Sequence, residues 1–227
     1  MKFRSQLVTA VSGSVGGLTG SHNAGGMYFR ARSQPVNPNT AQQQAVRNFM
    51  SQVTAAWQQV LTAPQRAAWE TYAANVPLVD PLGQSRNVSG IAMFVRSNVI
   101  RLQAGLARID AGPTVFSLPT FTAPTVTVDA TADEVDLAYT NTDAWAGEVG
   151  GAMLAYGSVP KSATINYFRG PYRYAGLVTG AVVPPTSPET IALPYPVVAG
   201  HVVHFKIQVV RADGRLSAPF RISGVAS

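Results

Sequence analysis

Residues 35–74 read PVNPNTAQQQAVRNFMSQVTAAWQQVLTAPQRAAWETYAA and predict two helices joined by a tight corner. The first helix should begin at Asn39 or Thr40, where a capping side chain follows two prolines. Thr62 can cap the second helix, with Pro64 in the first turn, where its missing N–H costs nothing. Hydrophobic residues recur at three- and four-residue intervals, as they do on one face of a helix. The two segments should therefore pack as a helical hairpin.

A third helix is predicted over residues 90–105, with Ser89 as its cap. The three helices together can enclose one small core built around aromatic side chains. We expect this helical core to contain Phe49, Val53, Trp57, Trp69, Tyr72 and Phe94. Arg96, Arg101 and Arg108 fall outside the apolar stripe of the third helix.

Residues 1–34 predict a glycine-rich β arm with a hairpin turn at residues 22–26, where Asn and Gly tolerate the left-handed backbone. In the following segment, MYFRAR, Tyr28, Arg30 and Arg32 alternate with apolar residues, which is strand periodicity. So many glycines leave too few side chains to bury a core. The arm should therefore lie on its own helices or on a neighbouring subunit.

The C-terminal part changes to short alternating strands separated by turn residues. The pattern predicts an α+β chain in four parts: a β arm over 1–34, a helical anchor domain over 35–112, a proline-rich extended linker over 113–124, and an all-β domain over 125–227. About seven short strands without cysteine, within about 100 residues, fit an immunoglobulin-like or fibronectin-type-III sandwich.

The chain has 227 residues, of which 46% are hydrophobic and only 12% are charged. Ten basic and three acidic residues precede Pro113, a net charge of +7, whereas seven basic and eight acidic residues follow from there. The arginines are scattered, so the sequence does not favour direct nucleic-acid binding. Cysteine is absent, which fits assembly in a reducing cytoplasm.

The apolar runs of the sequence are shorter than the roughly 20 residues that cross a bilayer, so no membrane association is expected. The opening MKFRSQLVTAVSGS has the basic start of a signal peptide. Its apolar segment, LVTAV, is shorter than the usual h-region of about 7–15 residues, so a β-strand is expected there instead.

The sequence predicts no enzymatic activity, cofactor or metal site. Of the three histidines, His22 lies in a glycine-rich turn, and His201 and His204 should lie on opposite faces of a strand, as surface or edge residues. Glu134 and Asp136 share a strand face, but oxygen-ligand cation sites need more carboxylates than this. A solvated sheet edge is the favoured interpretation.

Two clusters of Tyr and Arg are candidates for a binding surface, because these residues are enriched at interface hot spots. The first is the run NYFRGPYRYAG, and its candidate residues are Tyr167, Phe168, Arg169, Tyr172, Arg173 and Tyr174. The second comprises Tyr28, Arg30 and Arg32 of the arm. For the first cluster, ordinary cross-strand packing around a Gly–Pro turn stays open as an alternative.

The N-terminal half resembles a group of bacteriophage and prophage virion structural proteins. The resemblance lies in SGSVGG, in NAGGMYFRAR, and in the pattern N-P-x-T-x-x-Q followed by R-x-x-F, a Trp and L-T-x-x-Q-R-x-A-W. It covers residues 12–100, and the C-terminal part is only a generic match. The resemblance implies a component of a phage particle, assembled in the host cytoplasm, and it carries over no catalytic residue.

We therefore expect a capsid-attached decoration or head accessory protein that docks through residues 1–112 and displays the sandwich. Its expected partners are other virion proteins, namely the major capsid, portal or tail proteins, together with further copies of itself in an oligomer or lattice. A neck, tail or fibre-adaptor protein is one alternative. A module that binds glycans or the host surface through Tyr167–Tyr174 is the other.

Overall fold

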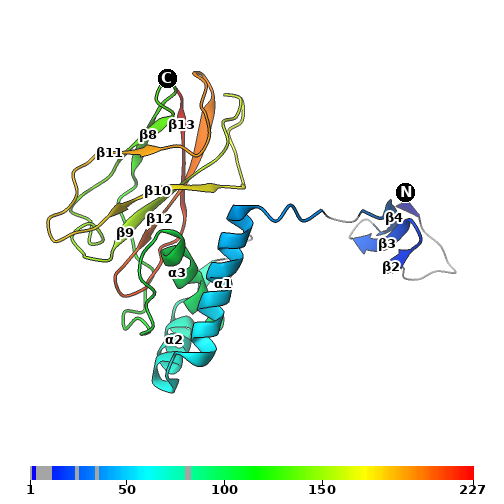
Figure 1. Ribbon diagram of the computed structural model, residues 1–227, viewed down its shortest axis with the longest axis horizontal. Helices are drawn as coiled ribbons and strands as arrows, with labels where there is room; N and C mark the ends of the chain where they lie inside the picture. The colour runs from blue at the N-terminus through cyan, green and yellow to red at the C-terminus, as the bar shows by residue number, and fades with distance from the viewer. Residues whose placement is uncertain (1, 4–11, 24–25, 34–35, 80–82) are drawn as a thin grey trace. The chain divides into compact units, whose positions relative to one another are not determined.

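The computed structural model describes residues 2–3, 12–23, 26–33, 36–79 and 83–227. They form a mixed α and β structure with three helices and several antiparallel sheets, as the predicted α+β class requires (Figure 1). The chain divides into two compact units, Met1–Ala41 and Gln42–Ser227. Each unit is described by itself below.

The N-terminal unit is a small antiparallel sheet. In the order β1-β4-β3-β2, its strands are β1 (Lys2–Phe3), β4 (Gly26–Ala31), β3 (Leu18–Asn23) and β2 (Gly13–Val15). Strands β3 and β4 pair from Leu18↔Ala31 to Asn23↔Gly26, which confirms the predicted hairpin. The turn residues 24–25 and most of the strand expected at the start of the chain, residues 4–11, lie outside the described residues.

The helical part of the second unit follows the predicted caps. It contains α1 (Ala41–Gln59), α2 (Ala63–Asn75) and α3 (Gly90–Gln103), with the short strands β5 (Leu78–Val79) and β6 (Ser85–Arg86) between the last two. The Thr62 side chain accepts from the Gln65 backbone N–H, and the Gln65 side chain accepts from the N–H of Thr62, a reciprocal capping box. The Ser89 side chain accepts from the Ala92 backbone N–H and so caps α3.

The predicted helical core is largely confirmed. Trp69, Tyr72 and Phe94 are fully buried together with Val53, and the rings of Trp69 and Phe94 meet edge to face at 5.4 Å. Trp57 is half-buried and packs against this cluster. Phe49 is also half-buried but lies outside it, because the first three turns of α1 contribute no buried side chain.

The C-terminal part has the seven strands that the sequence predicts. They are β7 (Thr125–Asp129), β8 (Glu134–Ala138), β9 (Ala152–Gly157), β10 (Arg173–Thr179), β11 (Glu189–Ala192), β12 (Val202–Val210) and β13 (Phe220–Val225). They form a four-stranded sheet, β10-β9-β12-β13, and a three-stranded sheet, β11-β8-β7. Side chains from both sheets, among them Leu137, Phe205 and Ile207, share one hydrophobic core.

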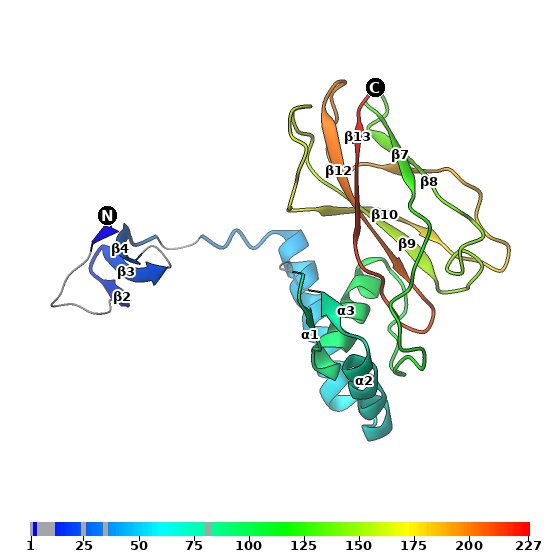
Figure 2. The ribbon, with the colours of Figure 1, turned by 180° about the vertical axis from the view of Figure 1, so that it is seen from behind.

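The end of helix α3 packs against one part of the second face of the four-stranded sheet, which we call its outer face. Leu154 and Val210 on this face pack with Ile100 and Ala104, at the end of α3. Figures 1 and 2 show α3 beside the sheet in both views. The end of α3 together with Tyr172, Tyr174 and Leu177 packs on the outer face of β9, and every residue of this strand is buried, although one face of an antiparallel sheet is commonly solvated.

Two arginines attach α3 to the sheet. Arg96 donates to the carbonyls of Leu216 (3.1 Å) and Ser217 (2.9 Å). Arg101, only 2% exposed, donates to carbonyls on three separate segments. These acceptors are Ala107 at 2.8 Å, Gly150 at 3.1 Å and Arg211 at 2.9 Å. Both arginines thus bind the protein's own backbone.

The segment between the helices and the strands does not act as a spacer. Residues 113–124 carry no helix or strand, as predicted for a linker. Just before them, the Trp69 indole N–H donates to the carbonyl of Asp110 at 3.0 Å, and the Asn98 side chain bonds both the N–H and the carbonyl of Ile109. Helices and sheets consequently belong to one compact unit, Gln42–Ser227.

Candidate functional site

The tyrosine-rich run that the sequence singled out lies partly in a loop and partly in β10. The loop comes back over the outer face of the sheet, where the Phe168 ring stacks on the His204 imidazole with centroids 5.6 Å apart and planes 19° apart. The Tyr172 hydroxyl donates to the carbonyl of Phe168 at 2.8 Å, which fixes the loop just before β10 begins. This part of the run therefore has a defined structure on the sheet.

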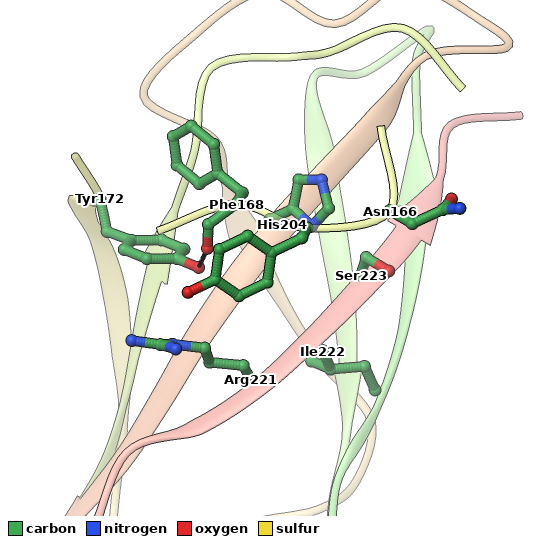
Figure 3. Close-up of a pocket in the computed structure, with 8 residues that line it drawn as sticks. Asn166, Phe168, Tyr172, His204, Arg221, Ile222 and Ser223 are labelled. Carbon is green, nitrogen blue, oxygen red and sulfur yellow. Dashed lines mark hydrogen bonds between the residues drawn. The ribbon is translucent and has the colours of Figure 1, made fainter. Parts of the chain in front are cut away.

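A hollow of about 120 Å³ opens between this loop and the ends of β12 and β13. Figure 3 shows the side chains around it. Its lining residues are Asn166, Tyr167, Phe168, Tyr172, His204, Arg221, Ile222 and Ser223. Aromatic rings and polar side chains thus share one concave site, which is smaller than the roughly 300–1,000 Å³ of pockets for drug-sized ligands.

The register of the sheet explains why residues distant in sequence meet there. On β12 and β13, His204 pairs with Ser223 and Lys206 with Arg221. Side chains alternate along a strand, so all four lie on the outer face, opposite Phe205 in the core. The sheet therefore places a histidine, two cations and a hydroxyl side by side.

The electrostatics of this face are cationic. Burial lowers the pKa of Lys206, and the nearby charge of Arg221 lowers it further. The Lys206 ammonium lies 4.0 Å from the centre of the Tyr156 ring, a cation–π contact. Burial raises the pKa of Tyr172, which Arg221 partly offsets. Neither Lys206 nor Arg221 forms an ion pair with a described residue.

The structure brings together only half of the predicted cluster. Tyr167, Phe168 and Tyr172 line the hollow. The other three predicted residues lie outside it. Arg169 is exposed, Arg173 lies 5.0 Å over the ring of Tyr195, and Tyr174 packs edge to face on Tyr156 at 5.7 Å. For Tyr174, the alternative of ordinary cross-strand packing is therefore correct.

The second predicted cluster belongs to the N-terminal unit. Tyr28 and Arg30 both lie in β4, opposite Ser21 and Thr19 of β3, and they share one face of the small sheet. Tyr28 is half-buried and Arg30 is exposed, as is Arg32, which follows the strand.

His204 is a correction to the sequence-based interpretation. We expected a surface or edge histidine, but its side chain is only 6% exposed and its Nε2 has no hydrogen-bond partner among the described residues. The loop that carries Phe168 covers it, and this long-range contact has no local sequence signal. Arg221 was not predicted either, although the alternation of β13 places it on the outer face.

The acidic residues considered for a cation site have other roles. Asp136 accepts from the Thr190 hydroxyl at 2.6 Å, and Asp133 accepts from the Val197 backbone N–H at 2.6 Å. Within the described residues, no three His, Asp or Glu side chains are grouped closely enough to hold a metal ion. Nor is any of the described helices long and apolar enough to cross a membrane.

No protein-family model matches the sequence, and no curated protein matches it. Among solved structures, the chain is similar to a family 76 glycoside hydrolase from a bovine Bacteroides thetaiotaomicron strain, with 9% identity and a TM-score of 0.34. The similarity covers 48% of this chain and 20% of the hydrolase chain. The chain thus matches about a fifth of that enzyme's length, and a likeness at this level supports no conclusion about activity.

Proposed function

We propose that this chain is a non-enzymatic structural protein of a bacteriophage particle, attached to the capsid as a decoration or accessory protein. The arm within Met1–Ala41 is the attachment element, and the compact unit is the part displayed. Two things support the proposal. Residues 12–100 resemble virion proteins, and the arm is exposed and positively charged.

The observation that carries the proposal is an ordered sheet without a core. None of the three clusters of buried apolar side chains includes a described residue of the arm. Val15 is 86% exposed and Leu18 is 54% exposed. A sheet of this size cannot offset the entropy of ordering its own backbone. A surface that covers the described strands would stabilise them.

The charge of the arm indicates the kind of surface. Residues 1–41 contain four basic residues and no acidic one, namely Lys2, Arg4, Arg30 and Arg32. In α3, Arg96 and Arg101 are less available to a partner, because their guanidinium groups bind backbone carbonyls. An acidic surface on neighbouring virion subunits, the capsid protein first among them, would complement the arm.

We further propose that the seven C-terminal strands form a sandwich of the immunoglobulin or fibronectin-type-III kind. Support comes from the two antiparallel sheets that share one core, and from the connections β8–β9, β10–β11 and β11–β12, each of which joins one sheet to the other. Such a module on a particle suits display. This fold by itself implies no ligand.

The copy number of the chain per purified particle tests the proposal. It can be measured by quantitative mass spectrometry against the major capsid protein. Decoration predicts a copy number in the hundreds that is a fixed fraction of the number of capsid subunits. A count of about six or twelve, the symmetry of neck and tail rings, would instead support the neck, tail or fibre-adaptor alternative. Absence from the particle would contradict both.

A further inference from the structure

The hollow beneath Tyr167 and Tyr172 contains a cation but no anion. None of its lining residues is acidic. Arg221 lines the hollow and lies opposite Lys206 in the sheet register. It takes part in none of the ion pairs among the described residues, which use Arg108, Arg211 and Arg215. An arginine presents paired N–H donors whose geometry matches a carboxylate.

A buried histidine also lines the hollow. His204 lines it, is more than nine-tenths buried, and leaves its Nε2 without a hydrogen bond to any described residue. Buried polar side-chain atoms in folded proteins are in large majority hydrogen-bonded. Stacking on Phe168 holds the ring in place, so it cannot turn toward water without losing that contact. Nε2 itself has almost no exposed surface, so His204 shapes the hollow and does not offer this atom to a ligand.

The remaining lining is amphipathic. The Tyr167 side chain is 69% exposed and offers an aromatic face at the rim. Asn166 and Ser223 each offer both a donor and an acceptor. A ligand that fits this set carries hydroxyl groups, an apolar face and one negative charge. A sugar residue with a carboxylate has all three.

We propose that the hollow binds a carboxylate-bearing sugar residue of an acidic glycan. Arg221 pairs with the carboxylate, and the Tyr167 ring packs on the C–H face of the sugar. Asn166 and Ser223 hydrogen-bond its hydroxyls, and the His204 ring forms part of the lining. An acidic side chain of a protein would satisfy Arg221 alone, which makes a glycan the better match to the whole lining. This assignment concerns the purified chain and does not depend on the proposed role in the particle.

The test is binding of two matched tetrasaccharides to the full chain, measured by titration calorimetry. The acidic probe alternates glucuronate and N-acetylglucosamine, and the neutral probe contains N-acetylglucosamine alone. We expect the acidic probe to bind with a dissociation constant below about 1 mM, and at least tenfold more tightly than the neutral one. Arg221→Gln should remove this tenfold preference. Arg169→Gln, an exposed arginine of the same loop outside the hollow, should retain it.

A second measurement needs no variant. The imidazole resonances of His204 should shift on addition of the acidic tetrasaccharide, because His204 lines the hollow. Equal affinity for both probes, unchanged binding by Arg221→Gln, or unmoved His204 resonances would each overturn the assignment. The third probe in this experiment is a glutamate tetrapeptide. If the peptide binds with the same dependence on Arg221 while the acidic sugar does not, the site recognises a protein carboxylate and the glycan assignment is wrong.

Discussion

The arm and the compact unit obtain their order in opposite ways. Gln42–Ser227 encloses three clusters of buried apolar side chains and uses buried arginines to join its helices to its sheets. The described residues of the arm have a sheet with registered strand pairs but no apolar cluster. Backbone pairing alone is marginal in water, since a two-stranded hairpin without a hydrophobic face is barely stable. The compact unit is thus stabilised by its own core, whereas for the arm we propose that a partner surface supplies the stability.

Removal of residues 1–33 should have the largest effect. We expect the truncated chain to keep the melting temperature of the compact unit to within about 1 °C, because the arm contributes no buried cluster. Its occupancy on purified particles should fall below detection. Melting is followed by circular dichroism and occupancy by mass spectrometry. A truncated chain that still occupies the particle, or that unfolds, would break the comparison between the two parts.

Arg101→Met tests how the helices are joined to the sheets. The substitution keeps the length of the side chain but leaves the carbonyls of Ala107, Gly150 and Arg211 without their donor. We expect the free energy of unfolding to fall by about 3 kcal/mol, since each buried unsatisfied acceptor costs about 1–3 kcal/mol. Urea denaturation measures it. Arg86→Met, at an exposed arginine, is the control and should change it by less than about 0.5 kcal/mol. If both substitutions changed the free energy of unfolding equally, the structural role assigned to Arg101 would be wrong.

A pair of glycine substitutions compares packing in the two parts directly. At Gly90, an added Cβ would lie 2.7 Å from the backbone nitrogen of Glu70, so α2 and α3 would have to move apart. At Gly17 in the arm, nothing lies within 4 Å of such a Cβ. Gly90→Ala should destabilise the compact unit by about 2 kcal/mol, the usual cost of overpacking. Gly17→Ala should leave the same unfolding transition unchanged. A reversed order of the two effects would contradict the described packing.

The smallest expected effect is a gain in stability. Tyr72 is fully buried, its hydroxyl has no hydrogen-bond partner among the described residues, and burial raises its pKa. Tyr72→Phe removes a polar group that folding takes out of water, so the free energy of unfolding should rise by about 1 kcal/mol. Thermal melting at neutral pH measures the change. A loss of stability would mean that the hydroxyl has a partner after all.

Local sequence signals predicted the elements well. Thr62 and Ser89 cap the helices expected of them, and Trp69 and Phe94 meet in the expected core. Alternation also found all seven C-terminal strands. These features depend on residues only a few positions apart in the chain, so the local sequence pattern is enough to predict them.

Features that depend on distant segments were missed. From the sequence we placed Arg101 outside the apolar stripe of its helix. In the structure it is buried and joins α3 to distant segments, because the carbonyls of Gly150 and Arg211 accept from it. The candidate site also depends on segments that are far apart in the sequence. Composition pointed to Tyr167 and Tyr172, but His204 and Arg221 come from strands far along the chain, and the sheet register alone brings them together. A partial signal existed in β12, where polar residues alternate with the core side chains of Val203, Phe205, Ile207 and Val209.

Hydrogen–deuterium exchange of the arm tests the central claim most directly. It compares backbone amides of residues 12–33 in the free protein with the same amides in chains bound to purified particles. The account predicts that the arm amides exchange within seconds in the free protein and become protected on the particle, while those of β9 and β12 are protected in both. Strong protection of the arm in the free protein, or rapid exchange on the particle, would contradict the claim that the arm is ordered by a partner surface.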